Sequence, residues 1–197
     1  MGVKLNKKQT VSLQKNTKFA LLGLGWDANR KGGYNLDLDL TLFLVNANGV
    51  CEEAEDMIFY NNYDGPNGCV HHTGDDRTGD SSSDGDDEQI QIDFDKVPDR
   101  IEAMYAVVTI DRAEARRQVF KDANRAYVRV CKTEKFNATE GDEEVMYDMT
   151  KEFTYSTGMV AAKIYRNGRG WAFEALGEEF DGGLYTMCKR FGIEVDD

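Results

Sequence analysis

Proline is scarce and no long hydrophobic run is present, and each absence narrows the class of protein. The chain has 197 residues with only 2 Pro against 19 Gly, which favours many tight turns and no rigid linkers. Its longest apolar stretch, residues 19–26, is interrupted by Gly23 and Gly25 and is too short to cross a bilayer. No apolar segment of a signal peptide follows the N-terminus. We therefore expect a cytoplasmic protein without a transmembrane segment.

Positive charge and closely spaced cysteines are also scarce. Lys and Arg number 24 and Asp and Glu number 36, so the formal net charge is -12. This excess of negative charge argues against a nucleic acid or an anionic membrane surface as the partner. The 4 cysteines form no Cys-x-x-Cys pair, which excludes a zinc ribbon and a thioredoxin-like motif and predicts free thiols.

Short β-type segments separated by Gly, Asn and Asp clusters recur along the chain. This spacing is typical of a mainly β fold, a two-sheet β-sandwich, with a few short α-helices. Asn167 and Gly168 predict a hairpin turn, a capping-box pattern at Asp111 and Glu114 predicts a helix over 112–121, and apolar spacing predicts another over 184–191. We expect one domain covering residues 1–197. The predicted strands cover residues 10–13, 19–24, 36–45, 57–60, 89–94, 101–110, 127–131, 159–165 and 170–175.

The segment 75–88 is unusually acidic, with seven carboxylates and one Arg. Its composition alone is equally consistent with a solvated loop. Residues 80–85 match the first half of a calcium-loop template, with oxygen-bearing side chains at positions 1, 3 and 5 and Gly85 at position 6. Position 12, however, is Gln91 instead of Glu, and residues 89–94 alternate like a strand, so we do not expect an EF-hand. The flexible turns still allow several carboxylates to converge on one hard cation.

Two further segments are rich in oxygen-bearing side chains. Residues 35–42 alternate between polar residues and leucine, so Asp37 and Asp39 share one face of a predicted strand while the leucines face the core. Asp is a poor strand former, which favours a specific role over an ordinary amphipathic strand. Asn61 belongs to an oxygen-rich turn at 61–65, for which turn chemistry is an alternative explanation. If the three segments converge, their carboxylates repel one another unless a cation lies between them.

The candidate ligands are hard oxygen atoms, which favours Ca²⁺ over Zn²⁺ or copper. The Gly-rich turns allow the irregular geometry that Ca²⁺ accepts and Mg²⁺ does not. His71 and His72 are adjacent, so on a strand they point to opposite faces, and we interpret both as structural.

Several motifs together resemble the TerD tellurium-resistance and stress-response domain, over essentially the whole chain. They are Gly23-Leu24-Gly25-Trp26-Asp27, Asp37-Leu38-Asp39, Phe59-Tyr60-Asn61-Asn62, the run from His72 to Gly79, Asp84-Gly85-Asp86-Asp87-Glu88, Ala115-Arg116-Arg117-Gln118 and Gly182-Gly183-Leu184. The resemblance implies a β-sandwich with short helices, two Ca²⁺ sites built from acidic loops, and a bacterial cytoplasmic protein of the stress response. Asp76 stands where relatives have Asn, and the stretch 80–83 is about two residues longer than in relatives.

The three segments and this resemblance together predict a non-enzymatic calcium-binding protein, with Ca²⁺ ions and other stress-response proteins as its partners. One alternative is a metal-dependent phosphoester hydrolase, although no motif for a nucleophile or a general base is present. The other is an anion-binding or cyclic-nucleotide-binding module that uses Arg112, Arg116 and Arg117. The predicted metal ligands are Asp37, Asp39, Asn61, Asp75, Asp76, Asp80, Asp84, Asp86, Asp87 and Glu88.

Overall fold

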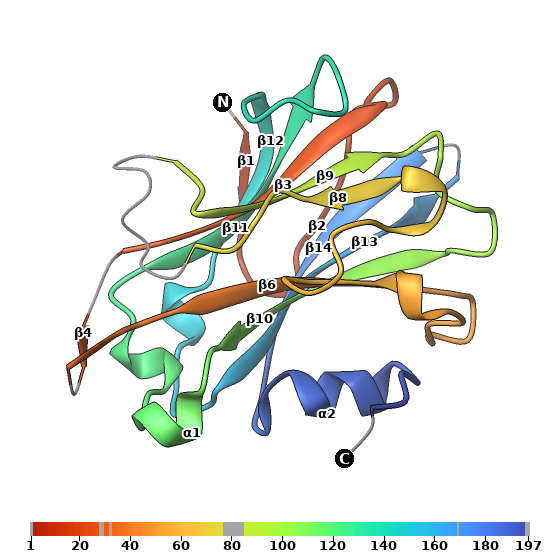
Figure 1. Cartoon of the computed structure of the whole chain (residues 1–197). Helices are drawn as coiled ribbons and strands as arrows, with labels where there is room; N and C mark the ends of the chain where they lie inside the picture. Colours follow the sequence, from red (N-terminus) through yellow and green to blue (C-terminus); the bar gives the residue numbers. More distant parts are fainter. Residues whose placement is uncertain (1, 28–29, 32, 77–84, 169, 196–197) are drawn as a thin grey trace.

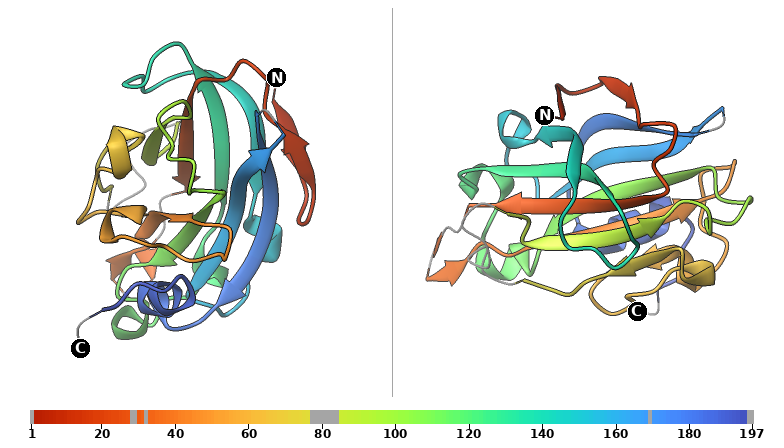
Figure 2. Two further views of the ribbon diagram at one scale, coloured as in Figure 1. Left: turned by 90° about the vertical axis from the view of Figure 1, so that its right-hand side faces the viewer. Right: turned by 90° about the horizontal axis from the view of Figure 1, so that it is seen from above.

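Two six-stranded sheets pack face to face in the computed structural model and form a β-sandwich (Figure 1, Figure 2). The structure describes residues 2–27, 30–31, 33–76, 85–168 and 170–195. The first sheet contains, in spatial order, β1 (Val3–Leu5), β12 (Asp142–Asp148), β11 (Ala126–Thr133), β3 (Phe19–Trp26), β9 (Glu88–Asp93) and β8 (Val70–His72). The second sheet contains β2 (Thr10–Ser12), β14 (Gly170–Phe180), β13 (Gly158–Asn167), β10 (Ala103–Ile110), β6 (Leu38–Val45) and β7 (Met57–Ile58). A two-stranded sheet pairs β4 (Arg30–Lys31) with β5 (Tyr34–Asn35).

The strands pair with their neighbours in antiparallel fashion, except that β1 runs parallel to β12. The hairpin between β13 and β14 is present as predicted, although Asn167 is the last residue of β13, paired with Gly170, and the turn begins at Gly168. The central pair β6 and β10 aligns Asp39 with Thr109 and Leu38 with Ile110. This register determines which side chains of β6 and β10 lie next to each other.

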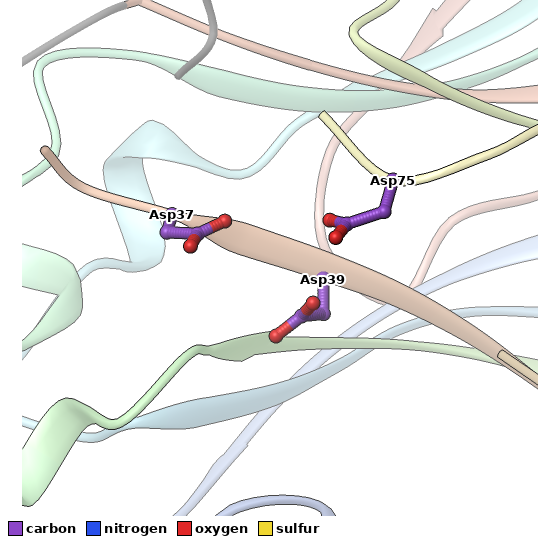
Figure 3. Close-up of side chains that lie close together, drawn as sticks. All are labelled: Asp37, Asp39 and Asp75. Atoms are coloured by element: carbon purple, nitrogen blue, oxygen red, sulfur yellow. The ribbon is translucent and has the colours of Figure 1, made fainter. Parts of the chain in front are cut away.

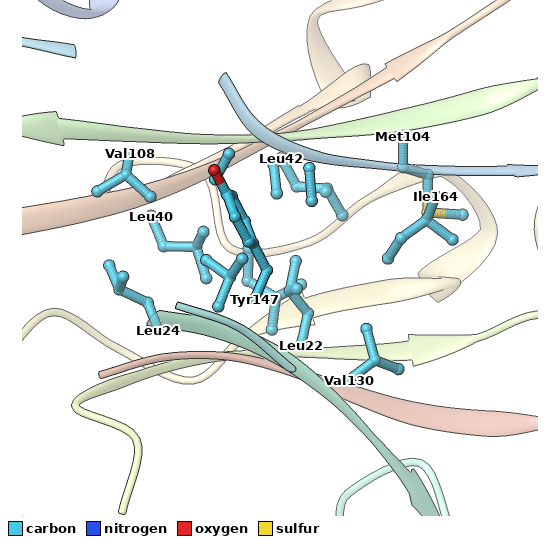
Figure 4. Packing of buried hydrophobic residues seen from close by; sticks show 14 of the residues in the cluster. Leu22, Leu24, Leu40, Leu42, Met104, Val108, Val130, Tyr147 and Ile164 are labelled. Carbon is cyan, nitrogen blue, oxygen red and sulfur yellow. The ribbon is translucent and has the colours of Figure 1, made fainter. Parts of the chain in front are cut away.

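The main hydrophobic core fills the space between the two sheets (Figure 4). Because side chains alternate along a strand, Leu38, Leu40, Leu42 and Leu44 of β6 all enter this core and are fully buried. Leu22 of β3 packs into the same core from the first sheet. Burying one such side chain contributes roughly 1.5–3 kcal/mol, so this alternation fixes the register of β6 and therefore the side on which its polar residues lie.

A second, smaller core lies on the outer face of the second sheet, under α2 (Gly183–Arg190). Phe43 of β6 stacks on Phe191, with ring centroids 4.6 Å apart, and Met187 and Cys188 of α2 are buried beside them. The predicted helix over 184–191 is therefore confirmed within one residue at each end. Among the described residues, no helix is long and apolar enough to span a membrane.

The prediction of a helix over 112–121 is wrong in length, because the observed helix is shorter. Helix α1 covers only Ala113–Arg116, because Arg112 and Arg117 both adopt left-handed backbone angles, with φ of 48° and 54°. Asp111 does not cap it and instead pairs with Arg116. After α1 the chain contacts a segment distant in sequence. The side-chain amide of Gln118 donates a hydrogen bond to the backbone carbonyl of Asn35. A 3-10 turn then covers Phe120–Asp122, and other 3-10 turns cover Ala54–Asp56, Pro66–Gly68 and Thr150–Glu152.

Each of the nine predicted strands corresponds to an observed strand, although the segment predicted at 57–60 is paired only over Met57–Ile58. The sequence patterns missed β1, β4, β5, β8 and β12. Strand β12 alternates weakly, since its residues are mostly exposed or half-buried. Edge strands of two or three residues carry too little pattern to be recognised.

Gly23 of β3 is needed for close packing, because a Cβ atom at this position would overlap the carboxylate of Asp86. We expect Gly23→Ala to lower the free energy of unfolding by about 1–3 kcal/mol through overpacking. Gly170→Ala is the matched control, since a Cβ at Gly170 meets nothing within 4 Å. Urea denaturation of both variants measures the difference, and equal stabilities would show that the Asp86 carboxylate does not constrain this position.

Candidate metal centre

Asp37 and Asp39 lie at the start of β6, on the face of the second sheet that points away from the first sheet. Their neighbours Leu36 and Leu38 enter the main core, so the alternation predicted for this segment is present in the structure. Both aspartates are nevertheless buried, since Asp37 is only 4% exposed and Asp39 only 8% exposed. An ordinary polar strand face would leave such carboxylates in water.

Asp75 is brought to the same place by the segment that follows β8 (Figure 3). One carboxylate oxygen from each of Asp37, Asp39 and Asp75 lies within 4.8 Å of the other two. Buried His72 fixes this segment, because its Nδ1 accepts the N–H of Gly74 at 3.1 Å while its Nε2 donates to the carbonyl of Leu40 at 3.2 Å. His72 therefore has a structural role, and it links the Asp75 segment to β6.

Burial and mutual repulsion raise the pKa values of Asp37, Asp39 and the neighbouring Glu88. Burial raises the pKa of Asp39 to about 8, and the negative charges of Glu88 and Asp37 add to the effect. Burial also raises the pKa of Asp37 to about 6, opposed by a hydrogen bond that Arg116 donates at 3.3 Å. The pKa of Glu88 is raised as well, again mainly by burial. Near neutral pH the metal-free cluster therefore holds a proton on Asp39 that an ordinary aspartate would have lost.

Some carboxylate oxygens in this region are buried and accept no hydrogen bond from the described residues. They are Oδ1 of Asp37, Oε1 of Glu88 and Oδ1 of Asp87. The second oxygen of Glu88 accepts the N–H of Leu40 at 2.7 Å, so only part of that group is satisfied. A buried polar atom without a partner costs about 1–3 kcal/mol. Asp37 Oδ1 in particular lacks the positive partner that a bound cation would supply.

The cluster of Asp37, Asp39 and Asp75 fits a hard divalent cation. Two oxygens bound to one Ca²⁺ at about 2.3–2.6 Å can lie no more than about 4.6–5.2 Å apart, and the separations found here meet that condition. The donors are all carboxylate oxygens, which suits Ca²⁺ better than Zn²⁺ or copper. They face a cavity of about 280 Å³. Its lining consists of Asp37, Asp39, Tyr60, Asp75, Asp111, Arg112 and Arg116.

The lining of this cavity includes three residues that no local sequence pattern places there, namely Asp111, Arg116 and Tyr60. Asp111 is held beside Asp37 because its N–H donates to the Asp37 carbonyl at 3.0 Å. Arg116 forms ion pairs with Asp111 at 2.9 Å and with Asp37 at 3.3 Å, so it offsets part of the negative charge. The proximity follows from the pairing of β6 with β10, for which the sequence carries no local signal.

Asp86 lies apart from this cluster. Its carboxylate forms an ion pair with Arg129 of β11 at 2.7 Å, and its side chain is fully buried. It also accepts a hydrogen bond from the side chain of Gln89 at 3.1 Å. These contacts link β9 to β11 and satisfy much of the carboxylate without a metal.

Asp87 and Asp76 form the described part of a second acidic group. Oδ2 of Asp87 accepts the N–H of Trp26 at 2.8 Å. Burial raises the pKa of Asp87 to about 6, and the charges of Asp76, Asp86 and Asp27 raise it further. Asp87 and Asp76 are therefore close enough to interact.

Another predicted ligand, Asn61, is not brought to the cluster. Asn61 is exposed in the tight turn that pairs Phe59 with Asn62, and it does not line the cavity. Turn chemistry, the alternative explanation for this segment, accounts for its position. Asp80 and Asp84 lie outside the described residues.

Comparisons with known proteins agree with this architecture. The model of the TerD domain matches residues 1–191. An uncharacterized protein of Bacillus subtilis, YceE, is 44% identical over 200 residues, which cover 99% of this chain and 100% of the relative. The tellurium resistance protein TerD of Serratia marcescens is 41% identical and general stress protein 16U of Bacillus subtilis is 37% identical, each over 99% of this chain and 100% of the relative.

A solved structure supports the fold. The crystal structure of a homologue of telluride resistance protein from Streptomyces coelicolor superimposes with a TM-score of 0.66. It is 19% identical in sequence, and the match covers 87% of this chain and 95% of that chain.

Proposed function

Because the chain belongs to the TerD family, and because two buried carboxylates of one segment meet an exposed carboxylate of another at one end of its sandwich, we propose that it is a calcium-binding protein of the tellurium-resistance and general stress-response type. The observation that carries the proposal is the cluster of Asp37, Asp39 and Asp75, in which a buried oxygen of Asp37 has no partner among the described residues. Curated relatives are named for tellurium resistance and for general stress, which supports the broader role.

In this proposal one Ca²⁺ is held by Asp37, Asp39 and Asp75. The ion replaces the proton that Asp39 holds near neutral pH and gives Asp37 Oδ1 its missing partner. It also ties the segment after β8 to the start of β6, so binding favours the closed arrangement of these two elements. Bound calcium would thus stabilise the contact between these two segments at the end of the sandwich.

A second Ca²⁺ is proposed beside Asp87 and Asp76. The support is the buried unpartnered Oδ1 of Asp87, together with the repulsion that Asp76 and Asp27 exert on this carboxylate. Calcium in this position would offset the repulsion between these carboxylates.

We further propose that the protein is not an enzyme and that it acts in the cytoplasm with other stress-response proteins. Both nitrogens of buried His72 are engaged by backbone groups, so this residue is not placed to act as a general base. For an anion-binding module, Arg112 and Arg116 would need to be free on one helix face. Arg112 instead precedes α1 in a left-handed conformation, and Arg116 is paired with acidic residues.

Calorimetric titration of the metal-free protein with Ca²⁺ tests the proposal. We expect saturable binding and a rise in the melting temperature, because a ligand present at 100 times its Kd adds about 2.7 kcal/mol to the stability of the folded state. Mg²⁺ at the same concentration serves as the control and is expected to bind more weakly, since it demands a near-octahedral shell. Absence of heat at about 1 mM Ca²⁺ with an unchanged melting temperature would exclude the proposal.

A further inference from the structure

Sulfur atoms from three elements gather at the other end of β6 from the acidic cluster. The thiol of Cys188 in α2 lies 3.7 Å from the thioether sulfur of Met57 in β7. The thiol of Cys51 lies 3.9 Å from the carbonyl oxygen of Asp56, the residue that precedes Met57. Cys51, Met57 and Cys188 all belong to the same buried cluster, and a negative charge on Cys188 raises the pKa of Cys51.

The packing of α2 on the second sheet holds these sulfur atoms together. Met57 pairs with Phe43 of β6, and Phe43 stacks on Phe191 at the end of α2. The N–H of Cys51 donates to the carbonyl of Phe191 at 2.8 Å, which ties the Cys51 loop to the same helix end. The second sheet, α2 and the hydrogen bond from Cys51 to Phe191 thus hold these sulfur atoms in one place.

The cluster lies close to the surface, although its atoms are mostly buried. Cys51 is 7% exposed, Met57 is 6% exposed and Cys188 is 4% exposed, whereas Cys69 is 0% exposed. Burial raises the pKa of Cys51 to about 12 and raises that of Cys188, so both thiols are protonated until a metal displaces the protons.

We propose that Cys51, Met57 and Cys188 form a binding site for a soft monovalent cation, Cu(I) or Ag(I). Thiolate and thioether sulfur are the ligands such ions prefer, whereas the oxygen atoms of the acidic cluster suit hard ions. The ion forms bonds to the sulfur atoms of Cys51 and Cys188, each of which releases one proton to water, and Met57 donates a lone pair without ionising. No electron is transferred, since the metal enters and remains as the monovalent ion.

The test is an anaerobic titration of the whole chain with Cu(I) in the presence of a coloured Cu(I) chelator. We expect the protein to withdraw one Cu(I) per chain from the chelator and to develop thiolate-to-copper charge-transfer absorption. Cys51→Ala and Cys188→Ala should each weaken binding by roughly 100-fold or more, because changing even an outer-shell partner of a metal site costs about 10–100-fold. Met57→Leu, which keeps the volume of the side chain, should weaken binding less.

Cys69→Ala and Cys131→Ala are the matched controls, since both residues are buried cysteines in other parts of the chain. They are expected to leave the affinity for Cu(I) unchanged, as is Asp39→Asn. A measurement on the unmodified protein guards against variants that fail to fold: X-ray absorption of the Ag(I)-loaded chain should show a first shell of sulfur only. A shell of nitrogen or oxygen, or Cu(I) affinity that survives both Cys51→Ala and Cys188→Ala, would overturn the proposal.

Discussion

Asp39→Asn is expected to weaken calcium-dependent stabilisation and, in the same protein, to make the metal-free state more stable at pH 8. The carboxylate is 8% exposed, and its burial, together with the negative charges of Glu88, Asp37 and Asp75, raises its pKa to about 8. Asparagine has the same shape but no charge, so it replaces an anionic ligand with a weaker neutral one and removes one source of repulsion. Allowing for the cost of burying an amide, we expect a gain of roughly 1–3 kcal/mol in the metal-free state.

The opposite signs of these two effects distinguish a metal ligand from an ordinary structural aspartate. Melting curves with a chelator and with saturating Ca²⁺ measure both effects on one sample of each variant. Asp93→Asn is the matched control, because Asp93 is also a buried strand aspartate and lies in β9 outside the cluster. We expect it to retain the full stabilisation by Ca²⁺. An Asp39→Asn variant that is still stabilised by Ca²⁺ to the same extent would contradict the assignment of Asp39 as a ligand.

The stability of the metal-free protein is expected to fall as the pH rises from about 4 to about 8. The pKa of Asp39 increases from 3.8 in the unfolded chain to about 8 in the folded chain, and the pKa of Asp37 increases to about 6. Between these values the folded state binds more protons than the unfolded state, so the stability decreases with pH. The loss of stability that results from these two raised pKa values is absent below about pH 4 and complete above about pH 8. Each such group contributes a slope of up to about 1.4 kcal/mol per pH unit.

Calcium reverses the sign of this dependence, because the ion binds the deprotonated carboxylates. The affinity for Ca²⁺ should rise by up to about tenfold per pH unit for each proton displaced, over roughly pH 6 to 8. Chemical denaturation at several pH values, with a chelator and with Ca²⁺, gives both curves. The Asp39→Asn variant should show a flatter metal-free curve. A metal-free stability that increases steadily from pH 4 to 8 would show that these carboxylates are not forced together in solution.

Part of this site could be predicted from sequence because two of its features are local. The alternation of leucine and aspartate at 36–42 identified the buried face and the polar face of β6, since a side-chain period of two leaves only one way to bury the leucines. The unusual density of carboxylates after His72 pointed to Asp75. Neither inference required knowledge of which strands pair.

The rest of the site depends on contacts between distant segments. Asp111 and Arg116 reach the cavity through the pairing of β6 with β10, which no local pattern reveals. The consecutive residues Asp86, Asp87 and Glu88 read as one acidic run, yet each meets different groups, such as Arg129 for Asp86 and the backbone of Leu40 for Glu88. Composition identifies an acidic segment, whereas the strand register decides which carboxylates share a cation.

The measurement that bears most directly on the proposed metal centre is a crystal structure determined with Ca²⁺, with the ion identified by anomalous scattering. It should show one Ca²⁺ bound by carboxylate oxygens of Asp37, Asp39 and Asp75 at about 2.3–2.6 Å. Asp37 Oδ1, which has no partner among the described residues, should be one of the ligands. A structure at saturating Ca²⁺ in which these carboxylates turn outward to water, with no ion between them, would contradict the account.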